Sequence, residues 1–131
     1  MRDASLLQMV DLRFVTGDDA RFQGTLSALE KALRRGDHML RYDSEDDFGT
    51  PETAFTVCTF WLIEALAKSS REEEAKRLFS DMLGRRTPAG LLSEDIDPVS
   101  GELWGNYPQT YSLVGIINCA VLLSKPWSDY R

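Results

Sequence analysis

Carboxylates and aromatic side chains are concentrated in one segment of the chain, residues 90–112. Its acidic residues are Glu94, Asp95, Asp97 and Glu102, and the aromatic residues next to them are Trp104 and Tyr107. Carboxylates can bond sugar hydroxyls or activate a water molecule, and aromatic rings stack on the apolar faces of sugars. The same residues also fit a plain acidic loop in which Asp97-Pro98 starts a turn. Composition alone therefore leaves carbohydrate chemistry and a structural loop both open.

Other kinds of reactive site have little support in the sequence. His38 is the only histidine and is expected at the surface near a helix end, and Ser112 has no visible histidine and aspartate partners. The acidic run at residues 43–47 lacks the ordered spacing of a calcium loop. Cys58 and Cys119 lie in apolar runs and are expected to be buried free thiols. We therefore expect no metal site and no cofactor.

Charge and hydropathy argue against two classes of partner. The chain has 15 Lys and Arg against 21 Asp and Glu, a formal charge of -6, which repels nucleic acid and anionic membrane surfaces. Its longest nearly apolar stretch, residues 114–123, is about half of the roughly 20 residues that span a bilayer. The N-terminus lacks the pattern of a secretion signal. We expect a cytoplasmic protein that binds neither nucleic acid nor membranes.

Two segments have the spacing of amphipathic helices with one buried face. Asp18 or Asp19 is expected to cap the first helix, and Gly36 to end it. The segment from Ser70 to Glu73 is a capping box that would open the second helix, which ends near Gly84. The apolar positions are Phe22, Leu26, Leu29 and Leu33 in the first helix, and Ala75, Leu78, Phe79, Met82 and Leu83 in the second.

Three further segments are apolar on nearly all sides and are expected to be buried helices. They are residues 4–15, a segment that Thr50 caps and that continues through Leu66, and a segment that opens at Pro108 and ends near Leu123. No segment shows the alternation of a strand.

Buried and amphipathic helices therefore alternate, and long connections at residues 37–49 and 85–107 lead into two of the buried helices. This alternation is typical of helical hairpins arranged in an inner and an outer layer, as in α/α toroids. The predicted fold is all-α, a helical-hairpin array that forms a partial (α/α) toroid of about five helices, with residues 1–131 as a single domain. Because a closed toroid needs about twelve helices, a partner chain or self-association would complete this arc.

The loop before the last helix resembles a motif of the glucoamylase family, glycoside hydrolase family 15, which includes trehalase-like branches. Ser93 to Pro98 and Gly105 to Ser112 match, in order and spacing, the two segments that lead into that family's last inner helix. The likeness covers nearly the whole chain. Further matching segments are Asp3 to Leu7, Arg41-Tyr42, Glu52 with Ala54-Phe55, and Cys58 to Leu62.

The resemblance implies an (α/α)6 barrel and suggests roles for single residues. Glu94 matches the family's catalytic base, which deprotonates the attacking water in an inverting reaction, and Arg41 matches a substrate-binding arginine. Tyr42, Glu52 and Trp104 are candidates for the cleft wall, with Trp104 standing where many members carry Leu. The family's general acid lies on an earlier part of the barrel, for which this sequence offers no match.

The sequence thus predicts the C-terminal segment of an inverting glycoside hydrolase that acts on α-glucosides such as maltooligosaccharides or trehalose. The chain is expected to be inactive alone, because general acid catalysis typically contributes about 10²–10⁴-fold to the rate. Its expected partners are a carbohydrate and either the N-terminal part of the barrel or a second copy. Two alternatives remain open: a non-catalytic helical module that binds a sugar or a protein, and a piece of a hydrolase whose chemistry occurs only in the parent.

Overall fold

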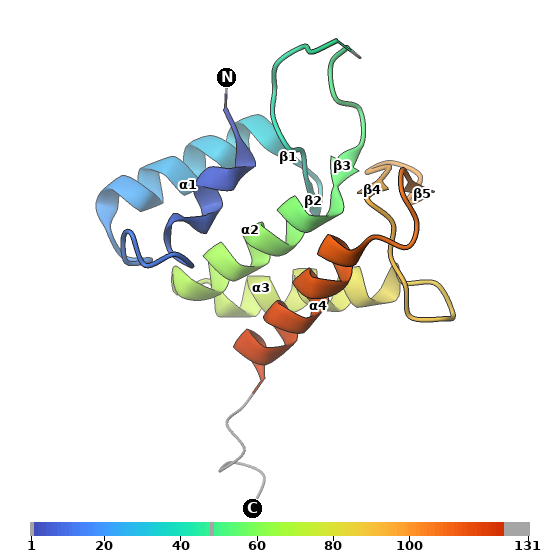
Figure 1. The fold of residues 1–131 in the computed structure, drawn as a ribbon. Coiled ribbons are helices and arrows are strands. Elements are labelled where there is room, and N and C mark those ends of the chain that lie inside the picture. The colour runs from blue at the N-terminus through green and yellow to red at the C-terminus, as the bar shows by residue number, and fades with distance from the viewer. Residues whose placement is uncertain (1, 48, 125–131) are drawn as a thin grey trace, which may run out of the picture.

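The computed structural model describes residues 2–47 and 49–124 and is mainly helical (Figure 1). Its helices are the 3-10 helix η1 (Ala4–Met9) and the α-helices α1 (Ala20–Leu33), α2 (Thr56–Lys68), α3 (Glu72–Gly84) and α4 (Thr110–Leu123). Its strands, each of two residues, are β1 (Arg34–Arg35), β2 (His38–Met39), β3 (Ala54–Phe55), β4 (Asp95–Ile96) and β5 (Leu103–Trp104). The described helices form no closed ring. The predicted open helical array is therefore confirmed.

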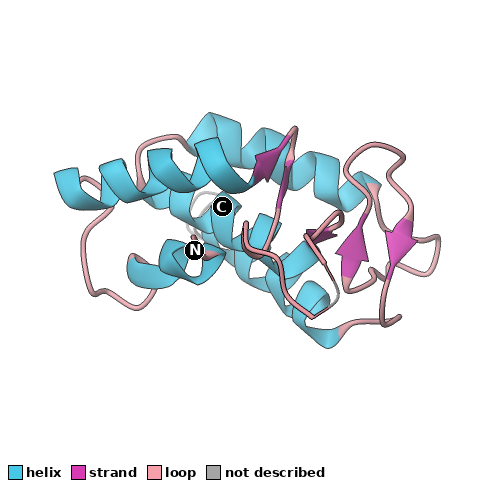
Figure 2. Ribbon diagram, turned by 90° about the horizontal axis from the view of Figure 1, so that it is seen from above, coloured by secondary structure: helices cyan, strands magenta, loops and turns pink. Residues whose placement is uncertain are grey.

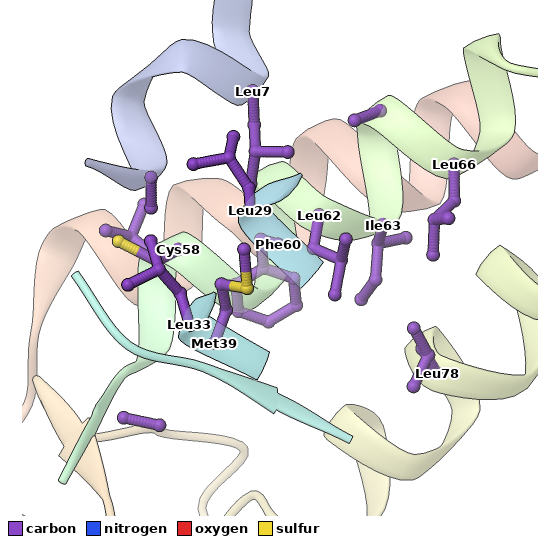
Figure 3. Close-up of a cluster of buried hydrophobic side chains, with 14 of the residues drawn as sticks. Leu7, Leu29, Leu33, Met39, Cys58, Phe60, Leu62, Ile63, Leu66 and Leu78 are labelled. Carbon is purple, nitrogen blue, oxygen red and sulfur yellow. The ribbon is translucent and has the colours of Figure 1, made fainter. Parts of the chain in front are cut away.

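Helix α2 is the centre of the packing, with η1, α3 and α4 all in contact with it (Figure 1). Figure 3 shows its side chains Phe60, Leu62 and Ile63 inside a cluster that also includes Leu29 from α1 and Leu78 from α3. Ten of the 13 residues of α2 are buried, so the predicted burial on nearly all sides is confirmed. Burial of this much apolar surface is the main favourable contribution to folding.

The two amphipathic helices also lie as their periodicity predicts. Asp19 caps α1 by accepting a hydrogen bond from the backbone N–H of Arg21 at 2.8 Å. All four expected apolar residues of α1 are buried, and in α3 Ala75, Leu78 and Met82 are buried. Such helices can be identified from the sequence because apolar residues on the side that faces the core recur every three to four positions.

Four charged residues connect the end of α1 with the start of α3. Arg34 lies 2.7 Å from Glu30 and 2.9 Å from Glu74, and Arg71 lies 2.6 Å from each of the same two carboxylates. Glu30 and Glu74 thus each pair with both arginines, one next to the same helix and one next to the other helix. The network is partly shielded from water, so it is screened less than isolated surface pairs.

Several predicted helix ends are wrong, because tertiary pairing replaces the expected local cap. Residues 54–55 form β3 with β4, so α2 begins at Thr56 and Thr50 does not cap it. Ser70 has a φ of +61° and caps nothing, since the residue before α3 is Arg71. Gly36, with a φ of +60°, makes the turn between β1 and β2 instead of ending α1.

The helix predicted at residues 4–15 is shorter than expected. Regular structure ends at Met9, and Leu12 and Phe14 are 74% and 77% exposed, although the apolar pattern placed both in a buried helix. The prediction for His38 is also wrong, because this side chain is buried in β2. Burial, with the nearby positive charge of Arg85, holds the pKa of His38 below its usual value. The imidazole is therefore neutral at pH 7.

Helix α4 packs against α2 with only one face. Ser112, Gly115 and Cys119 are its buried residues. A Cβ atom on Gly115 would lie 2.4 Å from a ring carbon of Phe60, so the absence of a side chain lets the two helices approach. Cys119 and Cys58 are both buried free thiols, as predicted, and burial raises the pKa of each.

Two small antiparallel sheets, absent from the sequence prediction, complete the described structure. One is the hairpin β1–β2, and the other has the strand order β3–β4–β5. Seen from above in Figure 2, the strands lie between the middle of the view and its right edge, and the left part of the view holds helices and loops only. Strands of two residues have no room for alternation, so periodicity could not identify them. None of the described helices is long and apolar enough to cross a membrane.

Candidate functional site

The three-stranded sheet joins the two long connections of the chain. Ala54 pairs with Ile96 and Phe55 with Asp95, so the first connection meets the second where α2 begins. The backbone N–H of Thr56 donates to the carbonyl of Glu94 at 2.8 Å and continues this pairing into the first turn of α2. The two long connections of the chain therefore come together at the start of α2. The carboxylate-rich loop is thereby fixed to a buried helix.

An open cleft of about 620 Å³ lies beside this sheet. Its lining residues are Arg41, Tyr42, Asp46, Gly49, Thr50, Pro51, Glu52, Thr53, Phe55, Glu94 and Asp95. Four of the five residues that the sequence singled out, Arg41, Tyr42, Glu52 and Glu94, therefore meet in one place although more than 50 positions separate the first from the last. A volume of this size is within the range of small-molecule sites.

Glu94 is half-buried at the edge of the cleft, and its carboxylate is held by one residue. Oε2 accepts hydrogen bonds from the backbone N–H of Asn106 at 3.1 Å and from its side-chain Nδ2 at 2.9 Å. The backbone N–H of Glu94 donates in turn to the Asn106 carbonyl at 2.9 Å. Oε1 accepts no hydrogen bond from the described part of the chain. One oxygen is thus anchored while the other stays available.

Gly105 makes this arrangement possible. Its φ of +76° lies in the left-handed region, where a side chain is disfavoured, and a Cβ there would lie 2.9 Å from Oε2 of Glu94. A glycine at this position therefore lets the backbone pass close to the carboxylate and turn Asn106 toward it. The Gly-Asn pair of the sequence motif has a direct structural function.

Asp95 supplies a second carboxyl group to the cleft. Its Oδ2 accepts a hydrogen bond from Thr53 Oγ1 at 2.9 Å, which connects β4 with the residue before β3. Burial, assisted by the nearby negative charge of Glu94, raises the pKa of Asp95 although the Thr53 hydrogen bond opposes this. The two neighbouring carboxyl groups of the loop consequently have different environments.

Arg41 contacts two residues through its guanidinium. Its Nη1 donates to Asp3 Oδ1 in an ion pair, and its guanidinium carbon lies 5.8 Å from the centre of the Trp61 ring. The backbone adds to this, because the N–H of Ala4 donates to the Arg41 carbonyl at 2.9 Å. Neither Asp3 nor Trp61 was singled out as a site residue from the sequence. Both lie inside segments of the family resemblance, Asp3 to Leu7 and Cys58 to Leu62, which was the available signal.

The remaining predicted site residues, Tyr42, Glu52 and Trp104, differ in their contacts and in their distance from the cleft. The hydroxyl of Tyr42 donates to Asp46, and this hydrogen bond raises the pKa of the tyrosine. Glu52 lines the cleft from an exposed position. Trp104 pairs with Asp95 across β4 and β5 but is 54% exposed and does not line the cleft. Among residues 2–47 and 49–124, no group of three His, Cys, Asp or Glu side chains is placed to hold a metal ion.

A helical array with paired carboxyl groups and a guanidinium around an open cleft is an arrangement suited to sugar hydrolysis. The sequence profile of glycosyl hydrolases family 15 matches residues 1–121, and the chain belongs to this family. It is 38% identical to a trehalase of Mycobacterium tuberculosis over 122 residues, which cover 91% of this chain and 18% of the relative.

Archaeal relatives show the same partial coverage. The chain is 37% identical to a trehalase of Thermoplasma volcanium over 124 residues, 94% of this chain and 20% of the relative. For a trehalase of Thermoplasma acidophilum the identity is 36% over 124 residues, 94% of this chain and 21% of the relative. The chain therefore spans about a fifth of the length of these curated relatives. No solved structure matches it significantly.

Proposed function

We propose that this chain forms the catalytic-base side of the cleft in an inverting α-glucoside hydrolase whose substrate is trehalose. The observation that carries the proposal is the Glu94 carboxylate, anchored by Asn106 at 2.9 and 3.1 Å in the same cleft as Arg41. The family membership supports hydrolysis of a glycosidic bond, and the names of the relatives support trehalose as the substrate.

Glu94 is assigned the role of general base. In an inverting hydrolase the base removes a proton from water as the water attacks the anomeric carbon. The two N–H donors on Oε2 fix the plane of the carboxylate, so Oε1 is the oxygen proposed to take the proton. A base held in one orientation loses less entropy when the reacting groups align.

The other cleft residues are proposed to bind the sugar. The Arg41 guanidinium carries planar donors that suit pairs of hydroxyls. Tyr42 and Glu52 would contact the sugar from the cleft wall, and Trp104 would do so from just outside it. Four carboxyl groups and one guanidinium line the cleft, which disfavours anionic ligands such as sugar phosphates. The charge therefore supports a neutral sugar.

Inversion also needs a general acid about 6.5–9.5 Å from the base, across the sugar. We propose that this acid belongs to a part of the barrel outside these 131 residues, and that the chain is a C-terminal arc which does not hydrolyse trehalose alone. The same part of the barrel is proposed to cover the exposed face of α4, where Tyr111, Val114, Ile117 and Val121 are apolar. Such exposed apolar surface is typical of an interface.

A chimeric trehalase tests the assignment of the base. Residues 1–121 replace the matching segment of the Mycobacterium tuberculosis relative, and glucose release from trehalose is measured. We expect activity in the chimera and a loss of about 10²–10⁴-fold with Glu94→Gln, the contribution of a positioned general base. Glu102→Gln is the matched control, because Glu102 is an exposed carboxylate of the same loop that does not line the cleft.

The isolated chain provides the complementary measurement. Trehalose and maltooligosaccharides incubated with it are expected to release no glucose. Hydrolysis by the chain alone, abolished by Glu94→Gln, would contradict the assignment of the acid to another segment. A folded chimera that binds trehalose and keeps its activity in Glu94→Gln would remove Glu94 from the mechanism. A chimera that binds trehalose without hydrolysing it would favour a sugar-binding module.

A further inference from the structure

The arginine of the cleft is held by residues that do not line the cleft themselves. Asp3 belongs to the segment that opens η1, and Trp61 lies in the second turn of α2. Both contact the Arg41 guanidinium, one through an ion pair and the other through its ring face at 5.8 Å. Neither residue is among those that line the cleft. Their contacts with Arg41 therefore indicate a role other than direct binding of the sugar.

Asp3 is itself fixed by local structure. It caps η1, where its Oδ1 accepts the backbone N–H of Ser5 at 2.8 Å and the Ser5 hydroxyl at 2.5 Å. It also forms a β-bridge with Tyr42, the neighbour of Arg41 in the cleft wall. Partial burial raises the pKa of the Asp3 carboxyl, but hydrogen bonds from Ser5 and Arg41 outweigh burial and leave the pKa below its usual range. The carboxylate is thus charged and oriented before any ligand arrives.

Trp61 makes the second contact with the Arg41 guanidinium. The residues next to it, Phe60 and Leu62, are fully buried, so the core fixes the position of α2 at this point. The Trp61 ring packs against that core and is half-buried. A guanidinium over an indole face within about 6 Å is attracted by the ring electrons. The ring therefore limits where the guanidinium can move.

The remaining donors of Arg41 are available. Its Nε and Nη2 groups donate to no acceptor in residues 2–47 and 49–124. We propose that Asp3 and Trp61 are positioning residues, which together hold the Arg41 guanidinium in the cleft so that these free N–H groups can bind sugar hydroxyls. This inference rests on the proposed function, because it assumes that Arg41 binds the sugar. A donor fork that is already oriented loses less entropy on binding than a mobile side chain.

The test uses the 131-residue chain and conservative variants. Asp3→Asn keeps an oxygen that can cap η1 but removes the charge that faces Arg41. Trp61→Phe keeps a ring face, and Trp61→Leu removes it. The matched control is Asp19→Asn, since Asp19 also caps a helix and also pairs with an arginine, Arg21, at 2.7 Å, but lies outside the cleft. Equal thermal stability of the two Asn variants shows that any difference between them is local.

The first readout needs no ligand. The ring of Trp61 shifts the NMR signals of the Arg41 Cδ protons, and this ring-current shift reports where the guanidinium lies. We expect the shift to shrink in Asp3→Asn and vanish in Trp61→Leu, while Trp61→Phe and Asp19→Asn retain most of it. An unchanged shift in Asp3→Asn would overturn the positioning role of Asp3.

The second readout is trehalose affinity, measured by NMR titration so that millimolar binding is detected. Asp3→Asn is expected to weaken binding about threefold to tenfold, the scale of one displaced charge-assisted hydrogen bond, and Asp19→Asn less than twofold. Normal affinity in Asp3→Asn, with affinity lost in Arg41→Ala, would overturn the positioning role alone. Equal affinity in wild type and Arg41→Ala would instead remove Arg41 from the proposed site, while the ring-current shift still decides whether the contact exists.

Discussion

Helices α2 and α4 are both composed mainly of apolar residues, yet the structure buries them to different extents. Ten of the 13 residues of α2 are buried, but only three of the 14 residues of α4. On α4 the side that faces α2 consists of small residues, and the opposite side exposes Ile117 at 61% and Val121 at 73%. Exposed apolar side chains that gather on one face of a helix are typical of an interaction surface.

The difference indicates that the amino-acid compositions of α2 and α4 are suited to different surroundings. The neighbours of α2 are all within this chain, so its composition and its burial agree. The composition of α4 agrees with its burial only if another apolar surface covers the exposed face. The chain spans about a fifth of the length of the trehalases that it matches, which is consistent with further helices next to α4 in those relatives. The proposed C-terminal arc explains both helices.

The largest effect is expected from truncating a side chain on each helix. Phe60→Ala removes a fully buried ring between α2 and α4 and should lower the free energy of unfolding by about 3–5 kcal/mol. Ile117→Ala removes an exposed side chain and should change it by less than about 0.5 kcal/mol. Urea denaturation of the isolated chain measures both. A cost for Ile117→Ala close to that of Phe60→Ala would mean that a second copy covers α4 in solution.

A smaller effect is expected from the only acidic residue of α2. Glu64 is buried, and burial, reinforced by the charge of Asp11, raises its pKa to about 7 although Lys68 opposes this. The folded state therefore binds a proton that the unfolded chain releases above its ordinary pKa of about 4.3. The neutral Glu64 carboxyl therefore contributes to the free energy of unfolding. This contribution is fully present below the pKa of the unfolded chain and is lost as the pH rises toward 7.

Glu64→Gln tests this directly, because the amide has the same shape and never ionises. At pH 4 wild type and variant should be similarly stable, whereas at pH 8 the variant should be more stable by about 1–3 kcal/mol. Unfolding free energies measured across this range give the difference. Glu73→Gln is the control, since it makes the same change of charge at an exposed carboxylate of α3. A Glu64→Gln curve parallel to that of wild type would show that the carboxyl is hydrated.

The reliability of sequence reasoning followed how local each feature is. The positions of α1 and α3 were predictable because a helix with one buried face repeats its pattern within a few turns. The start of α2 was not, because Ala54 and Phe55 pair with β4 about 40 positions away and no local signal reports this. The capping box at Ser70 failed for a related reason, since the turn between α2 and α3 takes a left-handed residue there.

The candidate site divides in the same way. Glu94 and Asn106 could be found as one motif because they lie 12 positions apart in a single loop. The contact of Arg41 with Asp3 spans 38 positions, and its contact with Trp61 joins a loop to a helix. Residue types indicate what such groups can do, but only the fold brings them together. Trp104 shows the converse, because it is near Glu94 in sequence and still lies outside the cleft.

The smallest effect on stability, and the most direct test of the comparison, comes from charging the exposed face of α4. Ile117→Lys and Val121→Lys place cations in water, so each should change the unfolding free energy of the chain by less than about 0.5 kcal/mol. In the chimeric trehalase the same substitutions would bury an unpaired charge against the proposed neighbour, and activity and thermal stability should both fall.

Substituting the exposed Val99 by Lys is the control, because Val99 lies in the loop after β4 and not on α4. A chimera that tolerates both charges would leave the apolar face of α4 without its proposed cover, and loss of a dimer from the isolated chain would assign that face to self-association.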